Sequence, residues 1–400
     1  MGAAFLRDMN WLGTERARGY LWVLAVLNIA MLAILLATSH GGVDANGFLI
    51  GTDFISFWTS GQMLHYAGNP YDGAAHIAAQ RAVHASPGAY TVFFYPPSFL
   101  PFCWPLGWLG YFPALGLWLI ATGALFVAAL RGWWREAGAG IPFWLALTAY
   151  PAMAIVITHG QTSWLVGGLL GIGLLNARTR PVLAGICLGL ATVKPQFGVL
   201  VPLALVASRE WKVVFVAGGT AIVLAAVSAL AFGPQVWPDW LAASGRAQEA
   251  MREGAVGFGK MVSVFAALRL LGMGAALAYA VQAVAGLAVA ALTLAAAWKR
   301  RWNAGLASIV LAGAPLVTPF VLDYDMVLVA FPLLWLAGEG LRSGFAPYEK
   351  LVLLLTFVAT AFARPMAMHL GLPIMPLVLV AFFALVWRRA TRGSGVHCVG

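Results

Sequence analysis

Residues 21–38 read LWVLAVLNIAMLAILLAT, an uncharged run close to the ~20 residues that cross a bilayer. Arg16 and Arg18 precede it without a convincing small-residue cleavage site, so we expect an uncleaved first span with the N-terminus inside. The whole chain has the same character, since 62% of its 400 residues are hydrophobic and 10% are charged. A soluble domain carries about 25% charged residues. The sequence therefore predicts an integral membrane protein.

Apolar runs recur along the chain and predict an all-α membrane bundle of about 12 transmembrane helices, forming a single domain over residues 1–400. The expected spans lie near residues 19–38, 111–131, 141–158, 161–177, 181–193, 197–208, 213–232, 275–298, 304–321, 325–338, 349–363 and 373–388. The fifth and sixth runs are short for a crossing. We expect them to tilt or to form broken helices buried within the bundle.

The net charge of +10 comes mostly from Lys and Arg in short links between these runs. If both termini are cytoplasmic, the clusters fall on the cytoplasmic side, as the positive-inside rule expects. No basic patch is interleaved with aromatic residues, so the charge does not indicate a nucleic-acid partner. Cys103, Cys187 and Cys398 have no metal spacing and form no disulfide framework. We predict neither a metal site nor a cofactor.

Two long connections, residues 39–110 and 233–274, are external in this arrangement. Within them, residues 54–67 and 262–271 have the patterning of interfacial helices. An Asp or Lys at mid-bilayer costs about 2.5–3.5 kcal/mol, so polar groups near the spans need a reason. Those groups all fall on the outer side: Asp53, Asp72, His76, His159, Gln161, Lys194, Arg252, Lys260, Asp323, Asp325, Arg364 and His369. Their convergence predicts a catalytic pocket on that face.

Asp53 and Lys194 are the strongest candidates. Asp53 opens the first external helix, where it would act as an N-cap, as a general base, or as both. Lys194 precedes Pro195, which disfavours helix at that position. We expect Lys194 to neutralise an anion such as a lipid-linked phosphate. The alternative is a lysine that snorkels to the outer headgroups.

The remaining candidates have simpler alternatives. The turn at 159–161, His-Gly-Gln, is either a polar hairpin or a donor pair for a sugar or phosphate. Asp323 and Asp325 have no third metal ligand nearby, which favours sugar hydroxyls or a basic partner such as Arg364.

The external loops offer two further features. Tyr95 starts a Tyr-Pro-Pro stretch that also suits a rigid interfacial turn. Arg252 and Lys260 would hold an anionic headgroup or form a solvated basic face.

Five motifs follow one another in an order typical of one family. They are DFISFWTSGQMLHYAGNPYD (53–72), YPPSFLPFCWPL (95–106), HGQTSWL (159–165), KPQFGVLVPL (194–203) and LDYD (322–325). On these motifs the chain resembles glycosyltransferase family 87, the polyprenyl-phosphate-mannose-dependent α-mannosyltransferases of bacterial membranes. The resemblance covers residues 53–325, and the last spans add only compatible hydropathy. Many relatives carry a histidine close to the final acidic motif, whereas Phe-Val-Leu precedes Asp323 here.

The resemblance implies a GT-C bundle whose first external loop, 39–110, bears interfacial helices and the catalytic acid. It implies transfer of mannose, or another hexose or pentose, from a polyprenyl-phosphate donor to a lipid or glycan acceptor. The reaction would invert the sugar, use Asp53 as base, need no metal, and occur at the extracytoplasmic face of the bacterial inner membrane. The implied donor-phosphate contacts are Lys194, Arg252, Lys260 and Arg364. The implied sugar and acceptor contacts are His159, Gln161, Gln196, Tyr71, Asp72, Tyr95, Asp323 and Asp325.

Two alternatives remain open at this point. A secondary transporter or flippase often has a similar number of spans, but transporters typically show repeated halves, and no repeat is visible here. A protein of the same fold would instead modify lipid A or a protein, or ligate a polymer. Sugar, acceptor and linkage are not determined by the sequence.

Overall fold

The computed structural model describes residues 2–84, 92–137, 140–254 and 257–392, and these form helices without any strand. The longest apolar helices are α2 (Thr14–Thr38), α6 (Tyr111–Ala137), α12 (Trp211–Phe232), α15 (Ala275–Ala297), η6 with α17 (Asp323–Val329 and Ala330–Ser343), and α18 (Glu349–Leu370). By length and composition these are the 6 helices of the described residues that can cross a membrane. The prediction of an all-α membrane protein is therefore confirmed.

The other expected spans coincide with shorter helices. These are α7 (Phe143–Ala149), α8 (Pro151–His159), α9 (Ser163–Asn176), α10 with η3 (Pro181–Leu190 and Ala191–Val193), η4 with α11 (Pro195–Phe197 and Leu200–Ala207), α16 (Ala304–Val317) and α19 (Met375–Arg392). Protein surrounds α9 and α16 on nearly every side, as expected of helices that are apolar all round. The total of about 12 crossings stays a prediction.

Proline breaks the helical backbone at two places, inside one expected span and between two others. The segment expected at 141–158 is two helices, because Pro151 begins α8 and Tyr150 before it has an extended backbone. Lys194 likewise leaves the helical region, with φ −133° and ψ 73°, between η3 and η4. This break directs a lysine into the interior of the bundle, where it makes the contacts of the candidate site.

Helices in the bundle approach closely where glycine faces a neighbour. A Cβ atom on Gly185 of α10 would lie 2.5 Å from Cβ of Val216 on α12, and one on Gly189 would lie 2.5 Å from Cβ of Thr220. Two glycines four residues apart therefore let the backbones of α10 and α12 meet, in the manner of small-residue contacts in membrane bundles.

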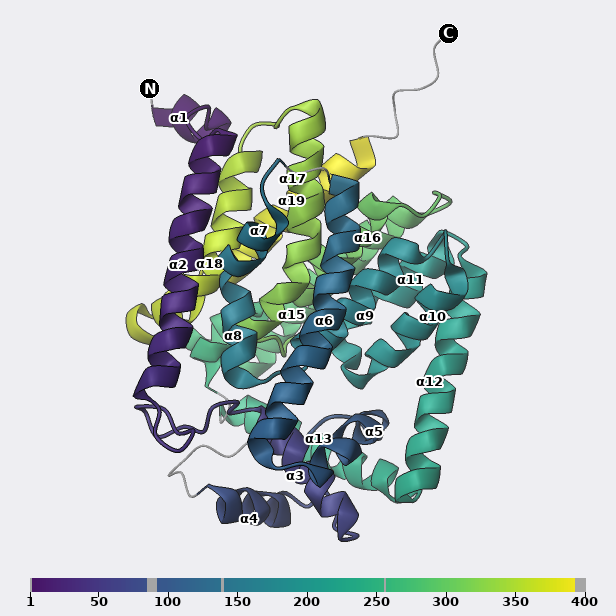
Figure 1. Ribbon diagram of the computed structural model, residues 1–400. Coiled ribbons are helices and arrows are strands. Elements are labelled where there is room, and N and C mark those ends of the chain that lie inside the picture. The colour runs from purple at the N-terminus through teal and green to yellow at the C-terminus, as the bar shows by residue number, and fades with distance from the viewer. Residues whose placement is uncertain (1, 85–91, 138–139, 255–256, 393–400) are drawn as a thin grey trace.

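The two long connections are folded. The first connection contains α3 (Phe54–His65), α4 (Gly73–Val83), η1 (Pro97–Phe99), α5 (Leu100–Cys103) and η2 (Trp104–Trp108). The second contains α13 (Val236–Glu253), η5 (Phe258–Lys260) and α14 (Val264–Leu270). The helices expected at 54–67 and 262–271 are confirmed as α3 and α14, whereas α4 and α13 were not expected. Figure 1 shows α3, α4 and α13 at one end of the bundle, opposite α1 (Gly2–Asp8) and the end of α19.

Close contacts fix α3 against the bundle. A Cβ atom on Gly61 would lie 2.2 Å from the carbonyl oxygen of Cys103, so only glycine allows this approach. The Tyr111 hydroxyl at the start of α6 donates to the carbonyl oxygens of Ile50 and Gly51, at 2.8 and 2.9 Å. These contacts hold α3 against α5 and hold the segment before α3 against the start of α6.

Candidate active site

Asp53 lies at the N-cap position of α3, but its side chain makes no capping hydrogen bond. Its backbone N–H donates to the carbonyl oxygen of His159 at 3.1 Å, which joins α3 to the turn after α8. The carboxylate oxygen Oδ2 accepts a hydrogen bond of 2.8 Å from Nε2 of Gln161. The N-cap interpretation is therefore right about position and wrong about the side chain, whose carboxylate points to the turn.

Gln161 joins three segments. Its Nε2 donates to Asp53 and to the Tyr324 hydroxyl at 3.1 Å, while its Oε1 accepts from the Tyr95 hydroxyl at 2.9 Å. The amide is buried and its orientation is fixed by donors and acceptors on both sides. The turn depends on Gly160, which has φ +64° and whose Cβ would lie 2.6 Å from Cβ of Phe54.

Lys194 is buried, with 3% of its surface exposed, and its Nζ lies 2.6 Å from Oδ1 of Asp325. The rings of Phe197 and Tyr324 flank the ammonium, with centroids at 5.1 and 5.2 Å. The same Oδ1 accepts a 2.7 Å hydrogen bond from Ser163. The snorkelling alternative is therefore wrong, because Lys194 points into the bundle and has a buried anionic partner.

Asp323 pairs with the basic partner that the sequence suggested. Its Oδ2 lies 3.5 Å from Nη1 of Arg364, and the same Nη1 lies 3.5 Å from Nε2 of His159. The His159 ring also contacts the Tyr324 ring, with centroids 5.7 Å apart. A histidine therefore lies beside the final acidic motif after all, supplied by the turn at 159–161 and not by the residues before Asp323.

These contacts make one network, which we call the Asp53 network. Its members are Asp53, Tyr95, His159, Gln161, Ser163, Lys194, Asp323, Tyr324, Asp325 and Arg364. Tyr324 and Ser163 were not singled out from the sequence, although both lie inside quoted motifs. Burial raises the pKa of the Tyr95 hydroxyl well above its ordinary value, so this group stays protonated and donates.

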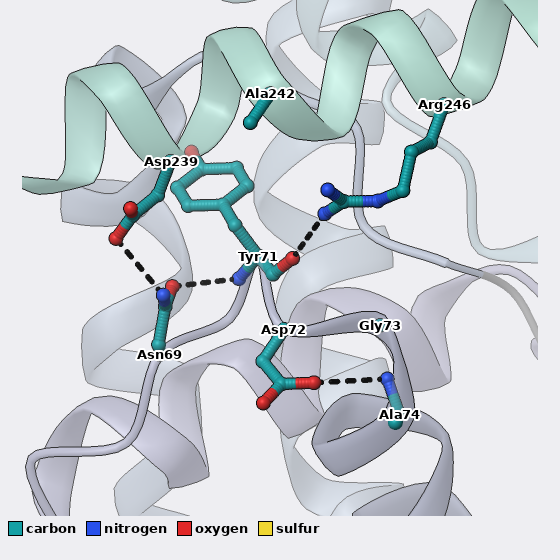
Figure 2. Close-up of a pocket in the computed structure, with 8 residues that line it drawn as sticks. All are labelled: Asn69, Tyr71, Asp72, Gly73, Ala74, Asp239, Ala242 and Arg246. Atoms are coloured by element: carbon teal, nitrogen blue, oxygen red, sulfur yellow. Dashed lines mark hydrogen bonds between the residues drawn. The ribbon is translucent and has the colours of Figure 1, made fainter.

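Tyr71 and Asp72 lie outside the network, at a pocket of about 540 Å³ between the first external connection and α13 (Figure 2). Oδ1 of Asp72 accepts from the backbone N–H of Ala74 at 3.0 Å and caps α4. The Tyr71 carbonyl oxygen accepts from Arg246 at 3.1 Å, and the Tyr71 hydroxyl donates to the Tyr95 carbonyl oxygen at 2.9 Å. Tyr71 therefore lines the pocket and also hydrogen-bonds directly to Tyr95, a member of the network.

Three other candidates are not brought into the network. Arg252 is exposed and pairs with Glu249 on α13, and Lys260 is exposed in η5. Gln196 is half-buried in η4, two residues from Lys194. Across the described ranges, no three His, Cys, Asp or Glu side chains gather closely enough to hold a metal ion.

His76 has a structural position between α3 and α4. Its Nε2 lies 3.2 Å from both the Ser60 hydroxyl and the Ser56 carbonyl oxygen, and its Nδ1 lies 2.8 Å from Nε2 of Gln80. Burial lowers the pKa of His76 from 6.5 to about 4. The neutral imidazole therefore fastens α4 to α3 and takes no part in the Asp53 network.

A family model for glycosyltransferase family 87 matches residues 93–319, more than half of the 400 residues. The chain belongs to glycosyltransferase family 87. It is therefore a membrane glycosyltransferase with a sugar donor and an acceptor, which decides against the transporter alternative. No curated protein and no solved structure matches the chain.

The matched region of this family 87 glycosyltransferase includes only part of the Asp53 network. Tyr95, His159, Gln161 and Lys194 lie within it. Asp53 precedes it, and the acidic motif and Arg364 follow it. The hydrogen bonds of Gln161 and Ser163 and the ion pair of Lys194 connect the matched region to acids outside it.

Proposed function

We propose that this protein transfers a sugar from a polyprenyl-phosphate donor to a hydroxyl of a lipid or glycan acceptor, with inversion and with Asp53 as the general base. The observation that carries the proposal is the Asp53 carboxylate, which leaves the helix N-terminus uncapped and accepts from Gln161 instead. A carboxylate held by one side-chain donor keeps lone pairs for the proton of an incoming alcohol.

The proposed reaction is a single displacement. Asp53 takes the proton of the acceptor hydroxyl while that oxygen attacks the anomeric carbon of the donor. The bond from the anomeric carbon to the phosphate oxygen breaks, and polyprenyl phosphate leaves with the bonding electrons. Charge therefore builds on the leaving phosphate, where cations stabilise the transition state most.

Lys194 and Arg364 are the cations that we propose for this phosphate. Lys194 has three N–H donors and gives one to Asp325, so two remain for phosphate oxygens. Arg364 has a longer contact of 3.5 Å to Asp323 and a half-buried side chain, which leaves it free to turn toward an anion. Arg252 and Lys260 are the weaker candidates, because both are exposed and outside the network.

We propose that the acceptor enters through the pocket of Figure 2. Its lining offers Tyr71, Asn69, Asp239 and Arg246, a mixture of aromatic and polar groups that suits sugar hydroxyls. Tyr71 donates to Tyr95, which in turn donates to Gln161 beside Asp53. His159, Asp323 and Asp325 would contact the transferred sugar, and Gln196 and Asp72 the ends of the acceptor path.

We also propose one GT-C-like domain over residues 1–400, with 39–110 as its catalytic loop and both termini cytoplasmic in a bacterial inner membrane. The support is electrostatic. The end of the bundle with α1 and the last turn of α19 carries Arg7, Arg389 and Arg392, and the Asp53 network lies toward the opposite end (Figure 1). Positive-inside bias then makes the Asp53 end extracytoplasmic.

The decisive experiment compares two aspartates of the first connection. Asp53→Asn in proteoliposomes supplied with polyprenyl-phosphate mannose should lower turnover by about 10²–10⁴, the contribution of a general base. Asp44→Asn is the matched control, because Oδ1 of Asp44 accepts only from the backbone of its own loop, at Asn46 and Phe48. Near-normal transfer by Asp53→Asn would remove Asp53 from its role.

A further inference from the structure

A cluster of cations lies away from the Asp53 network. Three links between helices meet there: the α9–α10 link with Arg178, the α11–α12 link with Arg209, and the α15–α16 link with Lys299, Arg300 and Arg301. They surround a pocket of about 360 Å³ that we call the basic pocket. Positive-inside bias explains cations in each link, but it does not explain why three links from distant parts of the chain share one pocket.

The charge of the basic pocket is not neutralised within the protein. Five of its lining residues are cations and Glu210 is the acid among them. In the described parts of the chain, none of these six residues takes part in an ion pair. Lys194 and Arg364 in the Asp53 network each have a carboxylate partner, whereas the five cations that line this pocket have none among the described residues. A concave surface with several unpaired cations attracts phosphate groups.

The backbone holds this arrangement in place. Arg209 and Lys299 both have left-handed backbones, with φ of +63° and +56°, which side chains other than glycine adopt at a cost. The backbone N–H of Lys299 donates to the carbonyl oxygen of Ala207 at 3.1 Å and joins two of the links. The buried Trp302 donates through Nε1 to the carbonyl oxygen of Leu174 at 2.7 Å and joins the α15–α16 link to α9, the helix that leads into the third link. The pocket is therefore a built feature of the fold.

Tryptophans mark the depth of the basic pocket in the membrane. Trp211 begins α12 and Trp298 directly follows α15, two helices that can span a membrane and are mostly not covered by protein. Both indoles are largely exposed. Exposed tryptophan at the end of a lipid-facing span is typical of the membrane–water interface, where lipid headgroups lie. From there α12 leads to α13 at the Asp53 end (Figure 1).

We propose that the basic pocket binds the phosphate headgroup of an anionic membrane lipid. The site is distinct from the donor site, since it lies at the other end of α12 from α13 and shares no residue with the Asp53 network. Its ligand is a lipid and not a soluble phosphate, because the exposed tryptophans place the pocket at headgroup depth. Guanidinium groups from all three links and the Lys299 ammonium provide both paired and single contacts to phosphate oxygens.

Native mass spectrometry of the full-length protein in detergent tests this directly with phosphatidylglycerol and phosphatidylcholine. We expect the wild type to bind phosphatidylglycerol in clear preference. Arg300→Gln with Arg301→Gln should weaken this binding roughly 30-fold, since each basic side chain near an anionic lipid surface contributes roughly 5-fold in affinity. The matched control is Arg135→Gln with Arg392→Gln, which removes the same charge from the last turns of α6 and α19. The control should change binding less than about 3-fold.

Three results would overturn the proposal: equal binding of the two lipids by the wild type, an equal loss in the control, or displacement of the lipid by equimolar glycerol phosphate. The last result would make the ligand a soluble phosphate. Arg178→Gln provides a milder test if the double variant does not fold, with an expected loss of roughly 5-fold. Elution volume and unfolding temperature report folding, and lipid binding is measured without the transfer reaction, so failure of the proposed activity would leave this result standing.

Discussion

The Asp53 network and the basic pocket hold positive charge in opposite ways. Lys194 is buried and lies 2.6 Å from Asp325, whereas Lys299 is exposed and has no ion pair among the described residues. A buried lone ammonium is very costly, so the interior lysine requires a carboxylate partner. A lysine at a wet interface requires none, because water and lipid headgroups solvate it.

This difference separates two functions of cations in a membrane protein. Within the Asp53 network, the buried Lys194 is fixed in direction by its close partner Asp325, an arrangement that suits localised charge. The unpaired cations of the basic pocket create a positive electrostatic potential that attracts anions. Removing a charge should therefore have structural consequences in the Asp53 network and almost none in the basic pocket.

The largest effect should come from breaking the buried pair. Lys194→Met leaves Asp325 buried without its partner and should lower the free energy of unfolding by about 3–5 kcal/mol. Lys299→Met removes the same group at the basic pocket and should change it by less than about 0.5 kcal/mol. Reversible unfolding in mixed micelles, followed by circular dichroism, measures both.

A double variant separates stability from activity. Lys194→Met combined with Asp325→Leu removes both buried charges and should recover most of the lost stability. Sugar transfer should stay absent, because the cation proposed for the donor phosphate is missing. If Lys194→Met is no less stable than Lys299→Met, the contrast between the two ends is wrong.

The next effect concerns His76, a base that burial keeps neutral. Its pKa of about 4 lies below the ordinary 6.5, so the unfolded chain binds more protons between these values. The stability contributed by the neutral imidazole is complete above pH 6.5 and is lost as the pH falls to about 4. The loss should reach about 3 kcal/mol.

Unfolding measured between pH 4 and 7 tests this titration. His76→Gln should flatten the dependence, since an amide does not titrate. His369→Gln, at an exposed histidine in the last turn of α18, should leave it as in the wild type. An unchanged slope in His76→Gln would show that other groups cause the acid loss.

Apolar periodicity and length were enough to predict the long helices. The ranges expected at 19–38, 213–232 and 275–298 agree closely with α2, α12 and α15, because lipid contact requires an unbroken apolar run. α13 was missed, since its acidic and basic residues give no apolar run and its helix lies at the end of the bundle that carries α3 and α4. The break at Pro151 was also missed, although proline there predicts one.

The site was predicted as a set of residues, but not as a set of partners. Lys194 and Asp325 are 131 positions apart, and nothing in either neighbourhood specifies the pair. Gln161 seemed to be part of a polar turn, yet it connects three segments, which only the folded chain reveals. Arg364 was named as a possible basic partner of the two acids, with sugar hydroxyls as the alternative, and the folded chain pairs it with Asp323.

Within the Asp53 network the smallest effect on stability should come from Arg364, and it distinguishes a positioned cation from a merely nearby one. About a third of its side chain is exposed and its contact to Asp323 is 3.5 Å, so Arg364→Gln should cost less than about 1 kcal/mol of stability. If Arg364 binds the donor phosphate, the same change should raise the KM for the polyprenyl-phosphate donor roughly 10-fold, the loss of one charged hydrogen bond. The KM for the acceptor should stay within about 2-fold. Arg252→Gln, at an exposed arginine paired only with Glu249, should leave both values near those of the wild type. If Arg252→Gln raised the donor KM and Arg364→Gln did not, the donor phosphate would bind beside α13 and not beside Arg364, because the guanidinium that contacts the phosphate would then lie outside the network.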